Sequence, residues 1–185
     1  IFLRGIIYGS YSQNGEDIYI LKYFNNKKKG FYVDIGAYHP KRFSNTYLLN
    51  KNNWSGVNIE ANPNLIKKFL KDRPNDINLN IGVSDKKDKL NFYLFDPLTL
   101  STFSEKMKNS YLNQRYNLIK TLNIDVLPLD QIFNENCTNK IIDLLTIDVE
   151  GYELEVLSGL DKISNLPKLI CIESIDHNQD DTKKL

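Results

Sequence analysis

The sequence is poor in cysteine and has no long apolar run, and each shortage excludes a class of protein. Two cysteines, Cys137 and Cys171, are too few for a disulfide framework or a cysteine metal cluster. We therefore expect a reducing, cytoplasmic setting. Nowhere do about 18 apolar residues follow one another, so we expect no membrane span.

An excess of charge of one sign is also lacking. The chain has 24 Lys and Arg against 23 Asp and Glu, a net charge of +1, so nothing global attracts it to nucleic acid. Arginine, which usually recognises phosphate and guanine, occurs only at Arg4, Arg42, Arg73 and Arg115. We expect no nucleic-acid partner. At 185 residues the chain is the size of one ordinary domain.

No internal repeat and no Pro/Gly/Ser-rich linker divides the chain, so we expect a single domain over 1–185 with 1–11 as a lead-in segment. Apolar runs alternate with helical patterns, which predicts an α/β fold with a mostly parallel sheet and helices on both faces. The expected core strands are 30–36, 55–60, 77–83, 141–149 and 168–174, with extra strands at 90–95 and 122–127. The polar stretch 96–120 between the extra strands predicts a lid, a substrate loop or local disorder.

Four carboxylates stand at the ends of four of the expected strands, namely Asp34, Glu60, Asp148 and Glu173. A single acidic residue at the end of a strand is common and needs no functional explanation. Four of them would converge on one crevice, because ligands of such sheets bind outside the carboxyl ends of the strands. The sequence therefore predicts a binding site at that edge.

The turn after the first strand decides between cofactors. Dinucleotide sites use Gly-x-Gly-x-x-Gly, whereas residues 34–40 contain one glycine, Gly36, and an acid that would repel a pyrophosphate. A cationic ligand without phosphate fits better, which favours S-adenosylmethionine. Glu60 is then placed to bind the ribose hydroxyls.

Asp148 and four further residues complete the expected cofactor site. Ala37 and His39 follow Gly36, and Ala61 follows Glu60. Ser84 follows the third strand and would hydrogen-bond the adenine edge, although a plain turn before the charged run is an equal alternative.

Three segments resemble the FkbM family of methyltransferases: 12–17, 33–37 and, most specifically, 143–159 with its Asp-Val-Glu-Gly sequence. The resemblance runs from about residue 12 to 175. It implies a class I methyltransferase fold that is Rossmann-like, dependence on S-adenosylmethionine, and usually O-methylation of sugars or natural products. Class I sheets usually end in an antiparallel strand pair, and 175–185 is too short and polar to supply both strands. We expect either a smaller sheet or a cut chain.

Methyl transfer to a hydroxyl benefits from a base or a metal, and we expect Asp148, Glu150 and Glu173 to be the catalytic residues. Asp148 and Glu173 would lie close enough to share a proton or a divalent cation, and whether a metal is used stays open. Glu150 has an alternative role, accepting backbone N–H groups at the start of the next helix.

The acceptor is expected to be a hydroxyl of a small molecule or glycan. Gln13 and Glu16, in the family-like amino-terminal segment, and His177, after the last strand, are expected on the substrate side. The bland alternative for the first segment is that Ser12 or Asn14 caps a helix. The competing functions are a non-catalytic binding or scaffold domain and a different α/β enzyme that binds a nucleotide in the same crevice.

Overall fold

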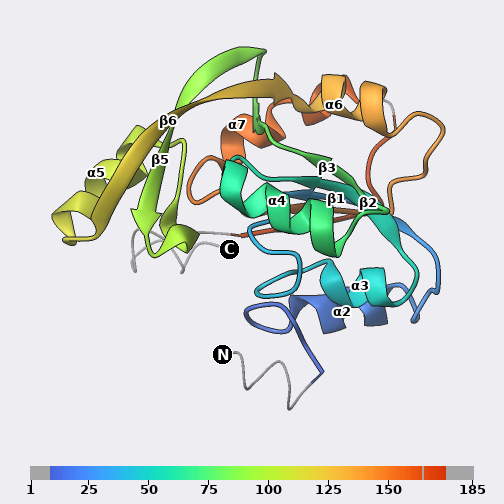
Figure 1. Ribbon diagram of the computed structural model, residues 1–185. Helices are drawn as coiled ribbons and strands as arrows, with labels where there is room; N and C mark the ends of the chain where they lie inside the picture. The colour runs from blue at the N-terminus through green and yellow to red at the C-terminus, as the bar shows by residue number, and fades with distance from the viewer. Residues whose placement is uncertain (1–8, 164, 174–185) are drawn as a thin grey trace, which may run out of the picture.

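A five-stranded parallel sheet forms the centre of the protein in the computed structural model, which describes residues 9–163 and 165–173. The strand order is β3-β2-β1-β7-β8, so the first strand lies in the middle and the chain crosses from one half of the sheet to the other after β3 (Figure 1). The strands are β1 (Phe31–Ile35), β2 (Ser55–Ile59), β3 (Ile77–Leu79), β7 (Leu144–Ile147) and β8 (Leu169–Ile172). The predicted α/β class and parallel sheet are confirmed.

Helices cover both faces of this sheet. Alternate residues of a strand point to opposite faces, and in β1 Val33 packs among residues of α6 and α7 while Tyr32 packs against α2 and α3. The helices are α2 (Glu16–Tyr23), α3 (Tyr47–Lys51), α4 (Pro63–Asp72), α6 (Leu129–Asn136) and α7 (Glu153–Leu157), with a 3₁₀ turn η2 (Leu160–Lys162). Strands β3 and β8 are the two edge strands, and no strand follows β8 within the described part of the chain.

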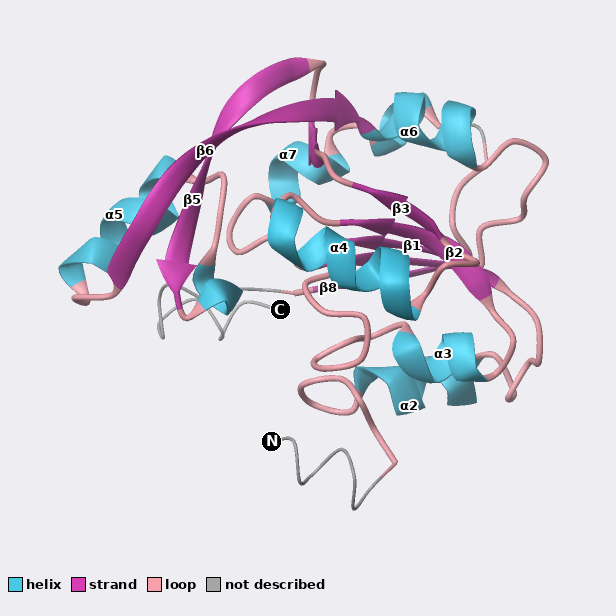
Figure 2. Cartoon of the chain, in the orientation of Figure 1, coloured by secondary structure: helices cyan, strands magenta, loops and turns pink. Residues whose placement is uncertain are grey.

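A second, three-stranded sheet stands beside the first (Figure 2). It contains β4 (Gly82–Ser84), β5 (Asp88–Asp96) and β6 (Asn117–Pro128), with the 3₁₀ turn η1 (Leu98–Leu100) and helix α5 (Glu105–Asn113) between the two long strands. Strands β5 and β6 pair antiparallel, and α5 packs on them through Met107 and Tyr111 against Tyr93 and Phe95. We call residues 88–128 the arm.

Two expectations about the strands need correction. The stretch 77–83 is not one strand: it divides into β3 and β4, which belong to different sheets, because the Asn80 side chain bonds the carbonyl oxygens of Glu60 and Ala61 and the chain leaves the central sheet there. The stretch 96–120 is not disordered or a plain loop, because it holds η1, α5 and the start of β6. Its expected role as a lid stays a prediction.

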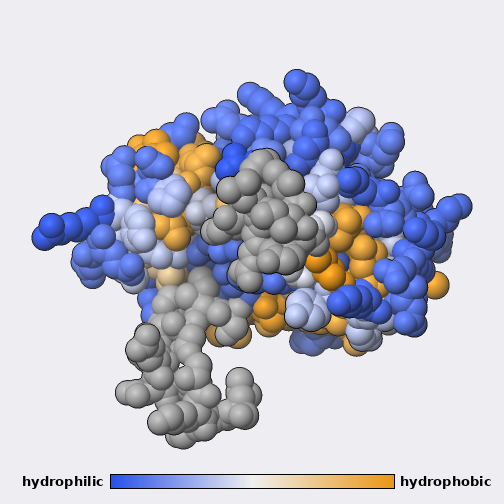
Figure 3. Space-filling view, turned by 90° about the horizontal axis from the view of Figure 1, so that it is seen from below, coloured by the Kyte–Doolittle hydropathy of each residue, from blue (hydrophilic) through white to orange (hydrophobic). Residues whose placement is uncertain are grey.

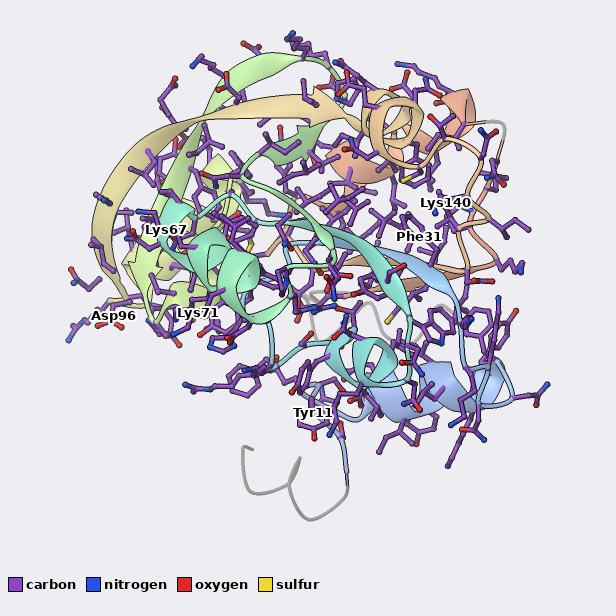
Figure 4. All side chains as sticks on the ribbon, turned by 45° about the vertical axis from the view of Figure 1, so that its right-hand side comes forward. Tyr11, Phe31, Lys67, Lys71, Asp96 and Lys140 are labelled. Atoms are coloured by element: carbon purple, nitrogen blue, oxygen red, sulfur yellow. The ribbon has the colours of Figure 1, made fainter. Side chains whose placement is uncertain are left out.

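The amino end of the sheet is fixed by charge pairs. Asp143, just before β7, accepts bonds from the Nζ atoms of Lys27 and Lys168 at 2.8 and 2.7 Å. Lys140 lies over the ring of Phe31 at 5.7 Å, at the same end of the sheet (Figure 4). The amino end of the central sheet is therefore stabilised by these ion pairs and by this cation–π contact.

The outer surface is mostly polar. Lys67 and Lys71 stand on the exposed side of α4, and the face seen from below shows hydrophobic patches separated by hydrophilic side chains (Figures 3 and 4). Among the described residues, the helices are too short or too polar to cross a bilayer.

A buried network joins β1 to α3 and α4. The Arg73 guanidinium donates to Asp76 at 2.9 Å, and both side chains are wholly buried. The guanidinium also donates to the Tyr32 phenol and to Thr46 Oγ1. The Thr46 hydroxyl in turn donates to Asp34 Oδ2 at 2.6 Å. One cation thus compensates the acidic and hydroxyl groups beneath the middle of the sheet.

Removing that cation is expected to destabilise the fold strongly. Arg73→Ala leaves Asp76 as an uncompensated buried charge, which costs about 3–5 kcal/mol. The free energy of unfolding in urea measures it. The control is Lys89→Ala, because Lys89 pairs with Asp125 at the surface with both side chains more than half exposed, and we expect a change of about 0–1 kcal/mol. Equal effects of the two substitutions would contradict the assigned role of Arg73.

Candidate functional site

A cavity opens at the carboxyl ends of β1, β2 and β7, between the central sheet and the arm. Its empty space is about 780 Å³, counting the part open to solvent. From the sheet side the lining includes Ile35, Gly36, Ile59, Glu60 and Ala61. From the arm it includes Phe92, Leu98, Thr99, Ser101 and Phe103. The charged residues among its described lining are all acidic: Glu60, Asp148 and Glu150.

Gly36 brings two loops together at the floor of the cavity. Its φ angle is +76°, a conformation that favours glycine, and a Cβ at this position would overlap the carbonyl oxygen of Asp148. The N–H groups of Gly36 and Ala37 both donate to the Ile59 carbonyl at 3.0 Å. The turn after β1 is therefore held against both β2 and the loop after β7.

Glu60 ends β2 with its carboxylate buried and held by backbone groups. Its Oε1 accepts from the Asn62 N–H at 2.6 Å and its Oε2 from the Tyr38 N–H at 2.8 Å. Burial raises the pKa of Glu60 to about 7, although these two hydrogen bonds oppose the rise. The bonds fix the carboxylate at the cavity wall.

Three carboxylates gather where the loop after β7 meets the end of β8. Oxygen atoms of Asp148, Glu150 and Glu173 all lie within 4.8 Å of one another. Burial and the neighbouring Glu173 raise the pKa of Asp148 well above its usual range, and burial raises that of Glu150 to about 7. Such a group can hold and pass a proton near neutral pH, and its oxygens are also near enough to one another for a divalent cation.

The loop that carries Glu150 has an unusual backbone. Glu150 and Gly151 have φ angles of +53° and +87°, so α7 begins only at Glu153. Glu153 Oε1 accepts the N–H groups of Val149 and Gly151 at 3.3 and 3.0 Å. The alternative role considered for Glu150 is thus filled by Glu153, and Glu150 is among the residues that line the cavity.

Comparison with known proteins agrees with this architecture. The methyltransferase FkbM domain family matches residues 34–184. The chain belongs to the FkbM methyltransferase family. No curated protein matches it. A solved structure, methyltransferase FkbM from Methylobacillus flagellatus KT, is 16% identical with a TM-score of 0.43, and the match covers 73% of this chain and 30% of that one. This chain therefore matches less than a third of that protein.

The segment before β1, which precedes the matched residues, is organised around a buried carboxylate. Asp17 accepts bonds from the hydroxyls of Ser10 and Ser12 at 2.6 and 2.9 Å and from the Tyr11 N–H at 2.7 Å. The resulting loop brings Gln13 to the cavity. Helix α2 has Gly15 at its N-cap position, and the Ser12 hydroxyl accepts the N–H groups of Gly15 and of Asp17 in the first turn at 3.1 and 3.3 Å, so Ser12 does satisfy the start of this helix.

Other predicted site residues lie off the cavity lining. Asp34 points to the Tyr32 face of the sheet, where it accepts the bond from Thr46, and burial raises its pKa to about 6. Side-chain alternation along β1 explains this placement, because Ile35 takes the cavity side. His39 Nδ1 instead closes its own loop, accepting from the N–H groups of Lys41 and Arg42 at 3.1 and 3.2 Å.

The remaining predicted residues are more scattered. Ala37 packs against α4, and Ser84 is buried with its hydroxyl 3.2 Å from that of Tyr152. The Glu16 carboxylate accepts from the Asn14 N–H at 2.9 Å and does not line the cavity. Residue His177 lies outside the described residues.

Several aromatic residues of the cavity wall were not predicted from the sequence as site residues, although Leu98 and Phe103 fall in the stretch expected to be a lid, a substrate loop or local disorder. Phe92, Leu98 and Phe103 line the cavity, together with Tyr38 and Phe43 from the loop after β1. The alternation in 90–95 predicted a strand, but nothing in it indicated that Phe92 faces the ligand cavity. These residues add an apolar wall opposite the carboxylates.

The raised pKa values predict that the FkbM domain loses stability as pH rises. Glu60 goes from an ordinary pKa of 4.5 to about 7 in the folded protein, so its contribution is full below about pH 4.5 and is lost as pH rises through 7. The loss is on the order of 3 kcal/mol. Urea unfolding between about pH 5 and 8 measures it, and Glu60→Gln should flatten the dependence. An unchanged slope in that variant would contradict the prediction.

Proposed function

We propose that this protein transfers the methyl group of S-adenosylmethionine to a hydroxyl of a small-molecule or glycan acceptor. The observation that carries the proposal is the cavity at the carboxyl edge of the sheet, with Glu60 on one wall and the group Asp148, Glu150 and Glu173 beside it. Membership of the FkbM methyltransferase family supports the reaction class.

The residues of the cavity fit this cofactor better than a dinucleotide. Its charged lining is acidic, which suits a ligand with a sulfonium and an ammonium group and repels a pyrophosphate. The carboxylate of Glu60 retains lone pairs for two ribose hydroxyls, and the aromatic and aliphatic arm residues suit an adenine ring. Gly36 lets the backbone approach closely at the floor.

The bound cofactor would supply a methyl group on a positively charged sulfur. The protein contributes position and exclusion of water, because the transfer is an in-line displacement that depends on orientation. Glu150, with a pKa of about 7, is poised to accept the acceptor's proton at Oε1 or Oε2 near neutral pH. Asp148 lies beside it, and burial together with the neighbouring Glu173 raises the pKa of Asp148 well above its usual range.

The acceptor side is proposed to lie along the arm. Leu98, Thr99 and Ser101, from the segment predicted as a lid, line the cavity with both apolar and hydroxyl groups. Such a mixture suits a neutral hydroxyl compound. We also propose a cytoplasmic location, supported by the unpaired state of Cys137 and Cys171.

A non-catalytic binding domain is the second candidate. The precise gathering of Asp148, Glu150 and Glu173 favours catalysis, because grouped carboxylates destabilise one another and a scaffold gains nothing from them. Measurements of binding and of turnover separate the two candidates.

Binding of S-adenosylhomocysteine tests the cofactor assignment. We expect calorimetric titration of the intact protein to give binding that Glu60→Gln weakens by about 10- to 100-fold, because a bond to a charged acceptor is lost. The matched control is Glu135→Gln on the exposed side of α6, which should bind like the unaltered protein. Absence of binding to the folded, unaltered protein would refute the assignment.

Turnover tests the base. With labelled S-adenosylmethionine and a panel of neutral glycosides and polyols, we expect Glu150→Gln to lower kcat by about 100- to 10,000-fold while S-adenosylhomocysteine binds as before. A kcat that stays within about twofold of the unaltered enzyme would show that another group removes the proton.

A further inference from the structure

The arm grips the loop that carries Glu150 through two hydrogen bonds. The phenol of Tyr111, on α5, donates to Glu150 Oε2 at 2.7 Å. Thr102, between η1 and α5, donates from Oγ1 to the main-chain carbonyl of Glu150 at 2.8 Å. Side chain and backbone of the same residue are therefore held by one segment, which lies about 40 to 50 residues away in the chain.

The grip coincides with the least favourable backbone of the loop. Glu150 has a φ of +53°, and left-handed conformations cost a non-glycine residue roughly 1–2 kcal/mol. Met107, one turn before Tyr111 on α5, covers Gly151, where a Cβ would overlap the Met107 side chain. A conformation of this kind persists only when its surroundings determine it, and here the arm does so.

The charged groups around Glu150 would otherwise drive its carboxylate away. Asp148 precedes it on the loop after β7, Glu173 approaches from the end of β8, and Glu153 lies at the start of α7. All three are acidic, so each disfavours an ionised Glu150 in this position. The Tyr111 phenol is a neutral donor facing the same carboxylate from α5.

Packing of the Tyr111 ring is separate from this bond. The ring lies edge-on to Phe95 at 5.5 Å and to Tyr116 at 5.9 Å, and it is buried between the arm's helix and strands. A phenylalanine would keep those contacts. The phenol oxygen itself is accounted for by Glu150.

We propose that Tyr111 is the positioning residue that fixes the Glu150 carboxylate on the acceptor side of the cavity. The role in catalysis rests on the proposed function, since it matters for turnover only if Glu150 is the base. The hydrogen bond holds Oε2 against the arm at a residue that lines the cavity. It also favours the ionised form that accepts a proton.

Tyr111→Phe tests the proposal in the full chain without a ligand. The protein is labelled with carbon-13 at the glutamate carboxyl, and the Glu150 signal is assigned by its loss in Glu150→Gln. We expect Tyr111→Phe to displace that signal and to raise its titration midpoint by about one pH unit. An unmoved Glu150 signal would overturn the proposal.

The matched control is Tyr93→Phe. Tyr93, on β5, donates to Glu105 on α5, the helix that also carries Tyr111. This variant therefore removes a tyrosine–glutamate hydrogen bond that does not involve Glu150. We expect its Glu150 signal to be unchanged, and an equal displacement in both variants would also overturn the proposal. Should Tyr111→Phe fail to fold, the protein is made with 3-fluorotyrosine at position 111. The more acidic phenol should lower the pH of the Glu150 titration midpoint. An unshifted midpoint would contradict the proposal.

The cofactor measurement is kept separate. S-adenosylhomocysteine should bind Tyr111→Phe within about twofold of the unaltered protein, because Tyr111 does not line the cavity. Failure of the unaltered protein to bind S-adenosylhomocysteine would refute the proposed function. The Glu150 signal would still test the Tyr111 contact, because that measurement needs no ligand.

Discussion

Repulsion between carboxylates at one edge of the central sheet is the constraint on which the rest of this structure depends. Parallel strands end at the same edge, so the acids at or just beyond the ends of β1, β2, β7 and β8 are brought toward one another. The contacts that hold these acids differ from one to the next. Thr46 donates to Asp34, which also lies near Arg73, backbone N–H groups donate to Glu60, and the Tyr111 phenol donates to Glu150, while burial and Glu173 raise the pKa of Asp148.

These devices also determine which groups remain free for a ligand. Asp34 is satisfied by a network on the Tyr32 face, so its charge acts on the cavity only at a distance. Glu60 is fixed in place but open on one side, which suits recognition. Glu150 is held by one oxygen and carries a pKa near neutrality, which suits proton transfer. The division between binding and chemistry therefore follows from how each charge is buried.

Much of the fold was predictable because its signals are local. Apolar runs in β1 and β7 are long enough to be recognised as buried strands, and the Asp-Val-Glu-Gly segment indicated the family, which the domain match confirmed. The direction of Asp34 required the exact strand register, since a shift by one residue reverses the face. The split of 77–83 depends on Asn80 bonding carbonyls about 20 residues away, and no local pattern encodes that.

The arm was the least predictable element and is the one that joins the two halves of the site. Helix α5 is polar in composition and buries little besides Met107 and Tyr111, so its sequence looks like a surface loop. In space, the arm that contains α5 places Phe92 and Phe103 on the cavity wall, and its Thr102 donates a hydrogen bond to the Glu150 carbonyl. Because one unit contacts both the proposed cofactor wall and the proposed base, a change in acceptor preference made in the arm will also alter the base.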